Sequence, residues 1–180
     1  MRVIAGKYKS RRLECPKGNV MRPTTDKVKE AMFGSLQFKI PGAKVLDAFA
    51  GSGSLGIEAL SRAAAHVDFV ENNRDCLRAL TSNLNMLDAE NYSLIKGDLL
   101  KSASRLQTYD IVFLDPPYDA QLYLPTLNMA HERGILEPGC TIVMECRKKF
   151  DFILPKEYNF IKRKDYGDIS LWFLEYGESS

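Results

Sequence analysis

The chain opens with two short patterns of apolar residues that differ in period. Residues 2–16 read as a short hairpin around Gly6, whereas residues 24–36 have the period of an amphipathic helix. The apolar positions of that helix recur every four residues and are Val28, Met32 and Leu36. Pro41 and Gly42 then break the pattern, so the helix is predicted to end before them.

From residue 44 onward, short apolar runs alternate with helical patterns. The runs predicted as strands cover residues 44–50, 66–72, 92–98, 109–117 and 139–147. The patterns predicted as helices cover residues 54–63, 74–87 and 122–135. Strands and helices that alternate in this way form a parallel sheet covered on both faces. Two β-rich runs between residues 158 and 176, separated by Gly167, predict an antiparallel pair.

The predicted fold class is therefore α/β, a doubly wound and mostly parallel sheet of the Rossmann-like kind with antiparallel C-terminal strands. A small basic hairpin and a helix precede the sheet. We expect residues 1–40 to form this N-terminal extension and residues 41–180 to form the main domain. The chain is short and shows no obvious extra apolar face, which favours a monomer.

Composition narrows the class of protein. The chain has 180 residues, 45% of them hydrophobic and 27% charged, which is ordinary for one globular domain. No apolar stretch approaches the ~20 residues that span a bilayer, and the basic start lacks the apolar core of a signal peptide. We therefore expect a cytoplasmic protein with no membrane partner. The four cysteines form no C-x-x-C pair and the two histidines stand apart, so neither a metal site nor a disulfide framework is expected.

Charge is unevenly distributed along the chain. Residues 1–30 hold nine cations and three acids, a net charge of +6, whereas the whole chain carries only +2. The remaining residues therefore carry −4. A basic arm on a mildly acidic body favours a polyanionic partner, although a solvated charged surface would have the same composition.

The ends of the predicted strands carry the candidate chemistry, because ligands of such sheets bind beyond the carboxyl ends of the strands. After the first strand, Gly51, Gly53 and Gly56 fit G-x-G-x-x-G, which lets backbone approach a ligand at a helix N-terminus. The same glycines would also suit a dinucleotide. Asp47 stands before them, where it would repel a pyrophosphate but could receive a ligand ammonium. It could instead only cap the loop.

Two further strands also end in acids. Glu71 follows the glycines by about 20 residues, a spacing suited to accepting both hydroxyls of a ribose. Asp98 could accept a hydrogen bond from an adenine amino group. A surface carboxylate for Glu71 and a turn or N-cap role for Asp98 are the plain alternatives. Together, the residues at these three strand ends suit a ligand with an adenine, a ribose and a charged amino-acid tail. S-adenosylmethionine has all three parts.

The fourth strand ends in Asp115, Pro116, Pro117 and Tyr118. Two prolines cannot continue a central strand, because neither has an N–H to donate. The Asp115 carboxylate and the Pro116 carbonyl can each accept one N–H of an aryl amine and so localise its lone pair for attack on a methyl group. Tyr118 offers a face on which a flipped base can stack, worth ~1–3 kcal/mol. A tight proline turn with an exposed Tyr is the alternative.

These residues resemble the S-adenosylmethionine-dependent methyltransferases of exocyclic amines, whose signature is Asp/Asn-Pro-Pro-Tyr/Phe. The segments RVIAGKYKSRRL, RPTTDKVKEAMFGSL, VLDAFAGSGSLGIEALSR and IVFLDPPY together resemble the RsmD family of small-subunit (16S) ribosomal RNA (guanine-N2)-methyltransferases. The resemblance covers nearly the whole chain. It implies that the main domain is a methyltransferase domain and that the substrate is ribosomal RNA in an assembling or assembled 30S subunit.

The resemblance also implies roles for individual residues. The expected catalytic residues are Asp115, Pro116, Pro117 and Tyr118. The expected cofactor-binding residues are Thr25, Asp47, Phe49, Gly51, Gly53, Glu71, Asn72, Asp98, Leu99 and Asp115, with Thr24 a further candidate. The cations expected to contact RNA phosphates are Arg2, Lys7, Lys9, Arg11, Arg12 and Arg22. Roles for Lys162, Arg163 and Lys164 stay open.

Other functions are compatible with parts of these patterns. An adenine-N6 DNA methyltransferase uses the same signature, but 180 residues leave no obvious room for a target-recognition domain. Enzymes that methylate glutamine side chains usually carry Asn where Asp115 stands, and an NAD-dependent oxidoreductase would explain only the glycines. A non-catalytic RNA-binding assembly factor is the alternative from another class. Such a protein would be expected to have lost residues of the cofactor loop, whereas the loop from Asp47 to Gly56 keeps them.

Overall fold

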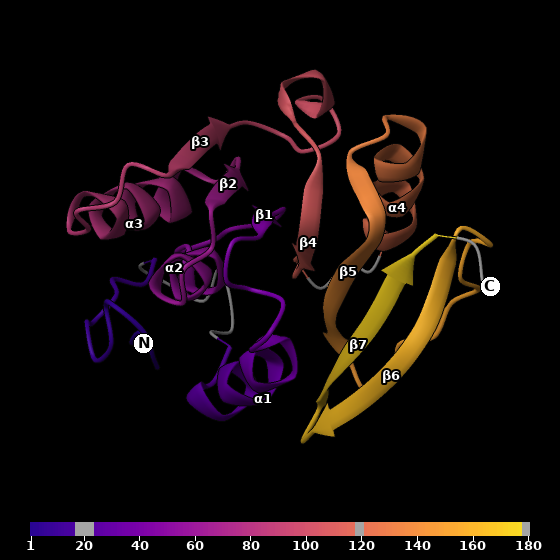
Figure 1. Cartoon of the computed structure of the whole chain (residues 1–180), viewed down its shortest axis with the longest axis horizontal. Helices are drawn as coiled ribbons and strands as arrows, with labels where there is room; N and C mark the ends of the chain where they lie inside the picture. The colour runs from indigo at the N-terminus through magenta and orange to yellow at the C-terminus, as the bar shows by residue number, and fades with distance from the viewer. Residues whose placement is uncertain (17–23, 118–120, 178–180) are drawn as a thin grey trace.

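The computed structural model of the chain describes residues 1–16, 24–117 and 121–177. Its centre is one seven-stranded sheet in the order β3-β2-β1-β4-β5-β7-β6 (Figure 1). The strands are β1 (Lys44–Asp47), β2 (His66–Glu71), β3 (Tyr92–Lys96), β4 (Tyr109–Leu114), β5 (Leu136–Arg147), β6 (Tyr158–Tyr166) and β7 (Ile169–Tyr176). Strands β1 to β5 pair in parallel, and β7 pairs antiparallel with both β5 and β6. The predicted fold class is confirmed.

Helices cover both faces of this sheet (Figure 1). They are α1 (Asp26–Leu36), α2 (Ser54–Ser61), α3 (Arg74–Asn85) and α4 (Tyr123–Glu132), with a 3₁₀ turn η1 (Ala103–Arg105) between β3 and β4. Helices α1, α2 and α3 pack on one face, which we call the α1 face, and α4 packs on the other. Side chains of a strand alternate between these faces, so Ile111 and Phe113 join the core under α1 while Val112 and Leu114 join the core under α4.

The parallel register brings the ends of three central strands together. Phe113 of β4 lies beside Asp47 of β1, and Leu114 lies beside Met144 of β5. Asp115 and Glu145 each follow this last pair by one residue, so they are neighbours and point to the same face. This end of the sheet, where the parallel strands terminate, is called the carboxyl end below.

The N-terminal segment folds back on itself, but few β-type backbone hydrogen bonds join its two arms. Among the described residues it has one antiparallel bridge, between Arg2 and Arg12, and no named strand. Most of its anchoring comes from α2: the Glu58 carboxylate accepts from the backbone N–H groups of Ile4 and Ala5 at 2.8 and 3.0 Å. The Ser61 hydroxyl likewise accepts from the N–H of Tyr8 at 2.9 Å.

A buried ion pair ties this segment to α1. The Nζ of Lys29 lies 3.1 Å from Oε2 of Glu58, and neither side chain is exposed to solvent. Lys29 also donates to the carbonyl of Arg2 and to the Ser54 hydroxyl, each at 3.0 Å. Burial lowers the pKa of Lys29, and the Glu58 charge opposes this effect. The two charges therefore join α1, α2 and the N-terminal segment into one unit.

The cysteines divide into one exposed thiol and three buried ones. Cys15 is exposed, whereas Cys76, Cys140 and Cys146 are buried. Burial raises the pKa of Cys76 to about 11 and that of Cys146 to about 12, and it raises the pKa of Cys140 as well.

No helix in the described part of the chain is long and apolar enough to cross a bilayer.

Candidate active site

The glycine loop connects β1 to α2 through two left-handed residues. Gly51 has φ of 56° and Gly53, the N-cap of α2, has φ of 83°, values that side chains disfavour. The loop is tied to the neighbouring strand, because the N–H of Ala50 donates to the carbonyl of Val70 at 2.9 Å. The predicted glycine turn therefore leads directly into a helix N-terminus at the carboxyl end of the sheet.

Gly56, the third glycine of the motif, serves the packing of α2 on the sheet. A Cβ there would lie 2.2 Å from Cε1 of Phe69, a β2 side chain with no exposed surface. We expect Gly56→Ala to lower the free energy of unfolding by about 1–3 kcal/mol, because the buried ring must shift to admit the added methyl group. Urea denaturation measures this change.

Gly34 in α1 provides the matched control for that substitution, because nothing lies within 4 Å of its Cβ position. Gly34→Ala should leave the stability unchanged or raise it by up to about 1 kcal/mol, through helix propensity alone. Equal denaturation midpoints for Gly56→Ala and Gly34→Ala would show that a methyl group at position 56 fits against Phe69, which would contradict this prediction.

Asp47 ends β1 with its side chain almost completely buried, at 2% exposure. One carboxylate oxygen accepts from the N–H of Gly56 at 2.9 Å, so the residue does cap the loop. Burial raises the pKa of Asp47 to about 7; the Gly56 N–H lowers this pKa and the charge of Glu71 raises it. In the described part of the chain no cation forms an ion pair with Asp47.

Glu71 is buried rather than solvated, and it organises backbone. Its two oxygens accept from the N–H groups of Gly51, Asn72 and Asn73 at 2.7, 2.8 and 2.7 Å. A carboxylate offers about four acceptor sites, so one site stays available beside these three. Asn72, which directly follows β2, is exposed to solvent.

The remaining predicted cofactor residues lie at the ends of β1 and β3. Asp98 is half-buried and its Oδ1 accepts from the N–H of Lys101 at 3.0 Å, which is the turn role given as its alternative. Leu99 is buried at 3% exposure, and Phe49 is half-buried against the same core. Both therefore contribute apolar surface near the acids.

Asp115 lies at the end of β4 among other acids. Although the residue as a whole is half-buried, desolvation of its carboxyl raises the pKa of Asp115 well above its ordinary value. The charges of Glu145 and Asp47 raise this pKa further. Pro116 is buried and Pro117 is exposed, while Tyr118 lies outside the described residues.

Glu145 is a site residue that the sequence reasoning missed. It is 2% exposed, it stands beside Asp115, and its Oε2 accepts from the Thr24 hydroxyl at 3.0 Å. Thr24 therefore reaches the carboxyl end of the sheet from the segment before α1. Thr25 instead caps α1, its hydroxyl accepting from the N–H of Val28 at 3.4 Å. An acid inside the apolar run TIVMEC was the available signal for Glu145.

The cations of the N-terminal segment differ in how they are used within the protein. Arg2 pairs with Asp26 at 3.0 Å and Lys7 pairs with Asp88 at 3.1 Å, both at the surface. Arg11 donates to the carbonyl of Met86 and lies over the Tyr8 ring. Lys9 and Arg12 are exposed, and Arg22 lies outside the described residues. Surface ion pairs contribute little to stability, so phosphates could replace them.

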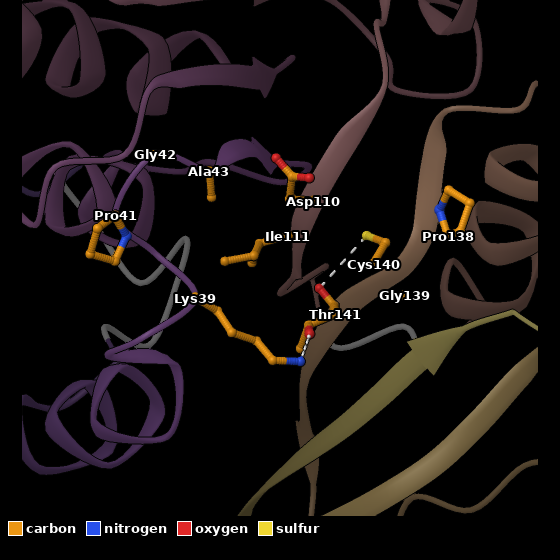
Figure 2. A pocket seen from close by; sticks show the side chains of 10 residues that line it. All are labelled: Lys39, Pro41, Gly42, Ala43, Asp110, Ile111, Pro138, Gly139, Cys140 and Thr141. Atoms are coloured by element: carbon orange, nitrogen blue, oxygen red, sulfur yellow. Dashed lines mark hydrogen bonds between the residues drawn. The ribbon is translucent and has the colours of Figure 1, made fainter.

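A separate cavity of about 330 Å³ lies at the opposite, amino end of β1, β4 and β5. Figure 2 shows Lys39 extending along it toward Thr141, whose hydroxyl accepts from Nζ at 2.9 Å. None of the predicted site residues that the structure describes lines this cavity. The predicted acids Asp47, Glu71, Asp98 and Asp115 lie instead at the carboxyl end of the sheet. The described residues include no group of His, Cys, Asp or Glu placed to hold a metal ion.

Comparison with known proteins identifies relatives of the whole chain. A family model described as "Conserved hypothetical protein 95" matches residues 1–175. Ribosomal RNA small subunit methyltransferase D of Haemophilus influenzae is 37% identical over 175 residues, covering 94% of this chain and 91% of that protein. The solved structure of the putative methyltransferase yhhF from Escherichia coli covers 99% of both chains with a TM-score of 0.89 and 32% identity.

A more distant structure shows the fold alone. It is a putative methyltransferase complexed with SAH, 15% identical, with a TM-score of 0.65 over 82% of this chain and 49% of that one. The fold is therefore the Rossmann-like methyltransferase fold. The chain belongs to the RsmD family, the ribosomal RNA small subunit methyltransferases D.

Proposed function

We propose that this protein transfers a methyl group from S-adenosylmethionine to the exocyclic N2 amine of a guanine in 16S ribosomal RNA, within an assembling or assembled 30S subunit. The observation that carries the proposal is the position of Asp115 and Pro116. They directly follow β4, which lies between β1 and β5, and Asp115 is near the buried acids Asp47 and Glu145. Membership of the RsmD family supports ribosomal RNA as the substrate class.

The residues at the carboxyl end fit this cofactor. S-adenosylmethionine supplies an electrophilic methyl group and carries an ammonium, a ribose and an adenine. Asp47, a buried carboxylate, suits the ammonium, and the remaining acceptor site of Glu71 suits a ribose hydroxyl. Leu99 and Phe49 would contact the adenine through their apolar surface.

Asp115 and Pro116 would hold the guanine amine. The carboxylate of one and the carbonyl of the other accept the two N–H groups, so the nitrogen lone pair is drawn out of the ring and aimed at the methyl group. The amine must lose one proton as the new N–C bond forms. The positive charge of bound S-adenosylmethionine favours the ionised form of Asp115. In that form the raised pKa makes Asp115 a stronger base than an ordinary aspartate, so it is suited to take the proton.

The pKa of Asp47 predicts how cofactor affinity depends on pH. The folded protein binds the ammonium best when Asp47 is charged, and its pKa of about 7 leaves it mostly protonated below neutral pH. We expect the affinity for S-adenosylhomocysteine to fall by up to about tenfold for each pH unit below 7. Isothermal titration calorimetry between pH 5.5 and 8 measures the profile. A profile in Asp47→Asn that keeps the same slope would contradict this role.

The function is tested by incubating the protein with S-adenosylmethionine labelled on the methyl group. Three substrates are compared: 30S subunits from cells lacking the enzyme, naked 16S ribosomal RNA, and duplex DNA. We expect label as N2-methylguanine in ribosomal RNA, with 30S subunits preferred. Label in DNA adenine would replace the proposal by the adenine-N6 function. Absence of transfer to every substrate, with cofactor binding intact, would favour the non-catalytic assembly factor.

A further inference from the structure

We propose that the protein holds its RNA substrate from two sides, and that a second basic surface, formed by the turn after β5 and by β6, contacts the phosphate backbone. This C-terminal basic surface consists of Lys148, Lys149, Lys162 and Lys164. In Figure 1, strand β6 lies across the sheet from the N-terminal segment, with α1 between them. The proposal rests on the proposed function and assigns the open role of the C-terminal cations.

Charge along the chain is concentrated in these two places. Residues 147–166 hold seven cations and three acids, a net charge of +4. Residues 1–30 carry +6 and the whole chain carries +2, so the rest of the protein carries −8. A body with a net negative charge repels a polyanion overall, so the two basic segments are the favoured places for RNA to approach.

The sheet register places the C-terminal basic surface in line with the candidate active site. Glu145 of β5 lies beside Leu171 of β7, which lies beside Lys164 of β6. Neighbouring strands are about 4.8 Å apart, so Lys164 lies roughly 10 Å across the sheet from Glu145. Lys164 also donates to the Ser35 hydroxyl of α1 at 3.0 Å, and Lys162 lies over the Phe173 ring. Both therefore lie on the α1 face, as Asp115 and Glu145 do.

Lys148 and Lys149 stand directly at the carboxyl end, on a turn held from several sides. The N–H of Lys148 donates to the carbonyl of Asp168 at 2.7 Å, and its own carbonyl accepts from the Arg163 guanidinium at 2.6 Å. Phe150 then packs on Tyr123, with ring centroids 4.7 Å apart. This anchoring fixes the backbone of the turn, so little backbone entropy is lost when its side chains bind.

The cations divide into structural and available ones. Arg163 pairs with Asp165 at 2.7 Å and lies over the Trp172 ring, so we assign it to holding the turn. Lys148 and Lys149 are exposed, and across the described ranges no carboxylate lies within ion-pair distance of either. These two side chains are therefore the best positioned to contact phosphates.

The test is the salt dependence of RNA binding by Lys148→Gln/Lys149→Gln, measured by filter binding to naked 16S ribosomal RNA and to 30S subunits. Each lost phosphate contact lowers the slope of log K against log salt by about 0.7–0.9. We expect a slope lower by about 1–2 and an affinity about tenfold weaker at 0.15 M salt. In the methyl-transfer assay KM should rise by the same factor, with kcat and cofactor affinity unchanged.

Lys44 and Lys156 provide the matched control, because both are exposed and lie at the amino end of the sheet. Lys44→Gln/Lys156→Gln removes the same charge and should leave the slope unchanged. An equal loss in this control, or an unchanged slope in the first variant, would overturn the proposal. So would a loss confined to 30S subunits, which would indicate a protein contact. Binding is measured without turnover, so failure of guanine methylation would refute the proposed chemistry and leave this result interpretable.

Discussion

Asp115→Ala is expected to lower the rate of methyl transfer by about 10²–10³-fold while the cofactor still binds. The substitution removes one of the two acceptors proposed to hold the guanine amine. It also removes a carboxyl that lies beside Asp47 and Glu145, whose charges raise the pKa of Asp115. Loss of this repulsion should preserve or raise stability, so the loss of activity will not reflect unfolding. Single-turnover methylation and thermal denaturation measure the two effects.

Asp115→Asn separates the two roles proposed for this side chain. Asparagine keeps an acceptor oxygen but cannot take a proton. An activity close to wild type would show that Asp115 acts only as an acceptor and that water takes the proton. An activity as low as that of the alanine variant would assign proton removal to Asp115. Full activity in the alanine variant would refute the role of the strand end altogether.

The second large effect is expected in stability, from Glu58→Ala. Glu58 pairs with the buried Lys29 at 3.1 Å and with Arg62 at 2.8 Å. It also accepts from the N–H groups of Ile4 and Ala5. Removal of one partner leaves a charge buried without compensation, so we expect the free energy of unfolding to fall by about 3–5 kcal/mol. Urea denaturation followed by circular dichroism measures the change.

Two further variants show whether the buried ion pair is the cause. Lys29→Met should destabilise less than Glu58→Ala, by about 1–3 kcal/mol, because Glu58 would still pair with Arg62 and hold the backbone of the N-terminal segment. Glu30→Ala, an exposed change on the same helix as Lys29, should alter stability by less than about 0.5 kcal/mol. A loss in Glu58→Ala no larger than that of Glu30→Ala would contradict the assignment.

Features set by local patterns could be predicted from the sequence. The alternation of strands and helices gave the parallel sheet, and the runs around Gly167 gave the antiparallel pair of β6 and β7. The prediction that candidate residues gather where the strands end follows from a general property of such sheets, so Asp47, Glu71 and Asp115 could be selected without coordinates.

Features set by contacts between distant segments could not be predicted. Thr24 and Glu145 are 121 positions apart, and Lys29 and Glu58 meet only because α1 and α2 pack on the same face. The spacing of apolar residues predicts a helix, but it does not predict which distant residue will pair with a buried charge on that helix. The predicted hairpin does fold back on itself, with one bridge between its two arms. The side chains that accept hydrogen bonds from its backbone belong to α2, and this could not be predicted from the segment alone.

The contrast among the cysteines makes the native chain suitable for site-specific labelling. The thiolate is the reactive form, and burial with a raised pKa keeps Cys76, Cys140 and Cys146 protonated at neutral pH. A maleimide reagent should therefore modify Cys15 alone. Cys15 follows Glu14, whose N–H donates to Asn83 at 2.7 Å, so the label is carried by an anchored part of the N-terminal segment. A fluorophore or photo-crosslinker there would report on bound RNA in the unaltered sequence.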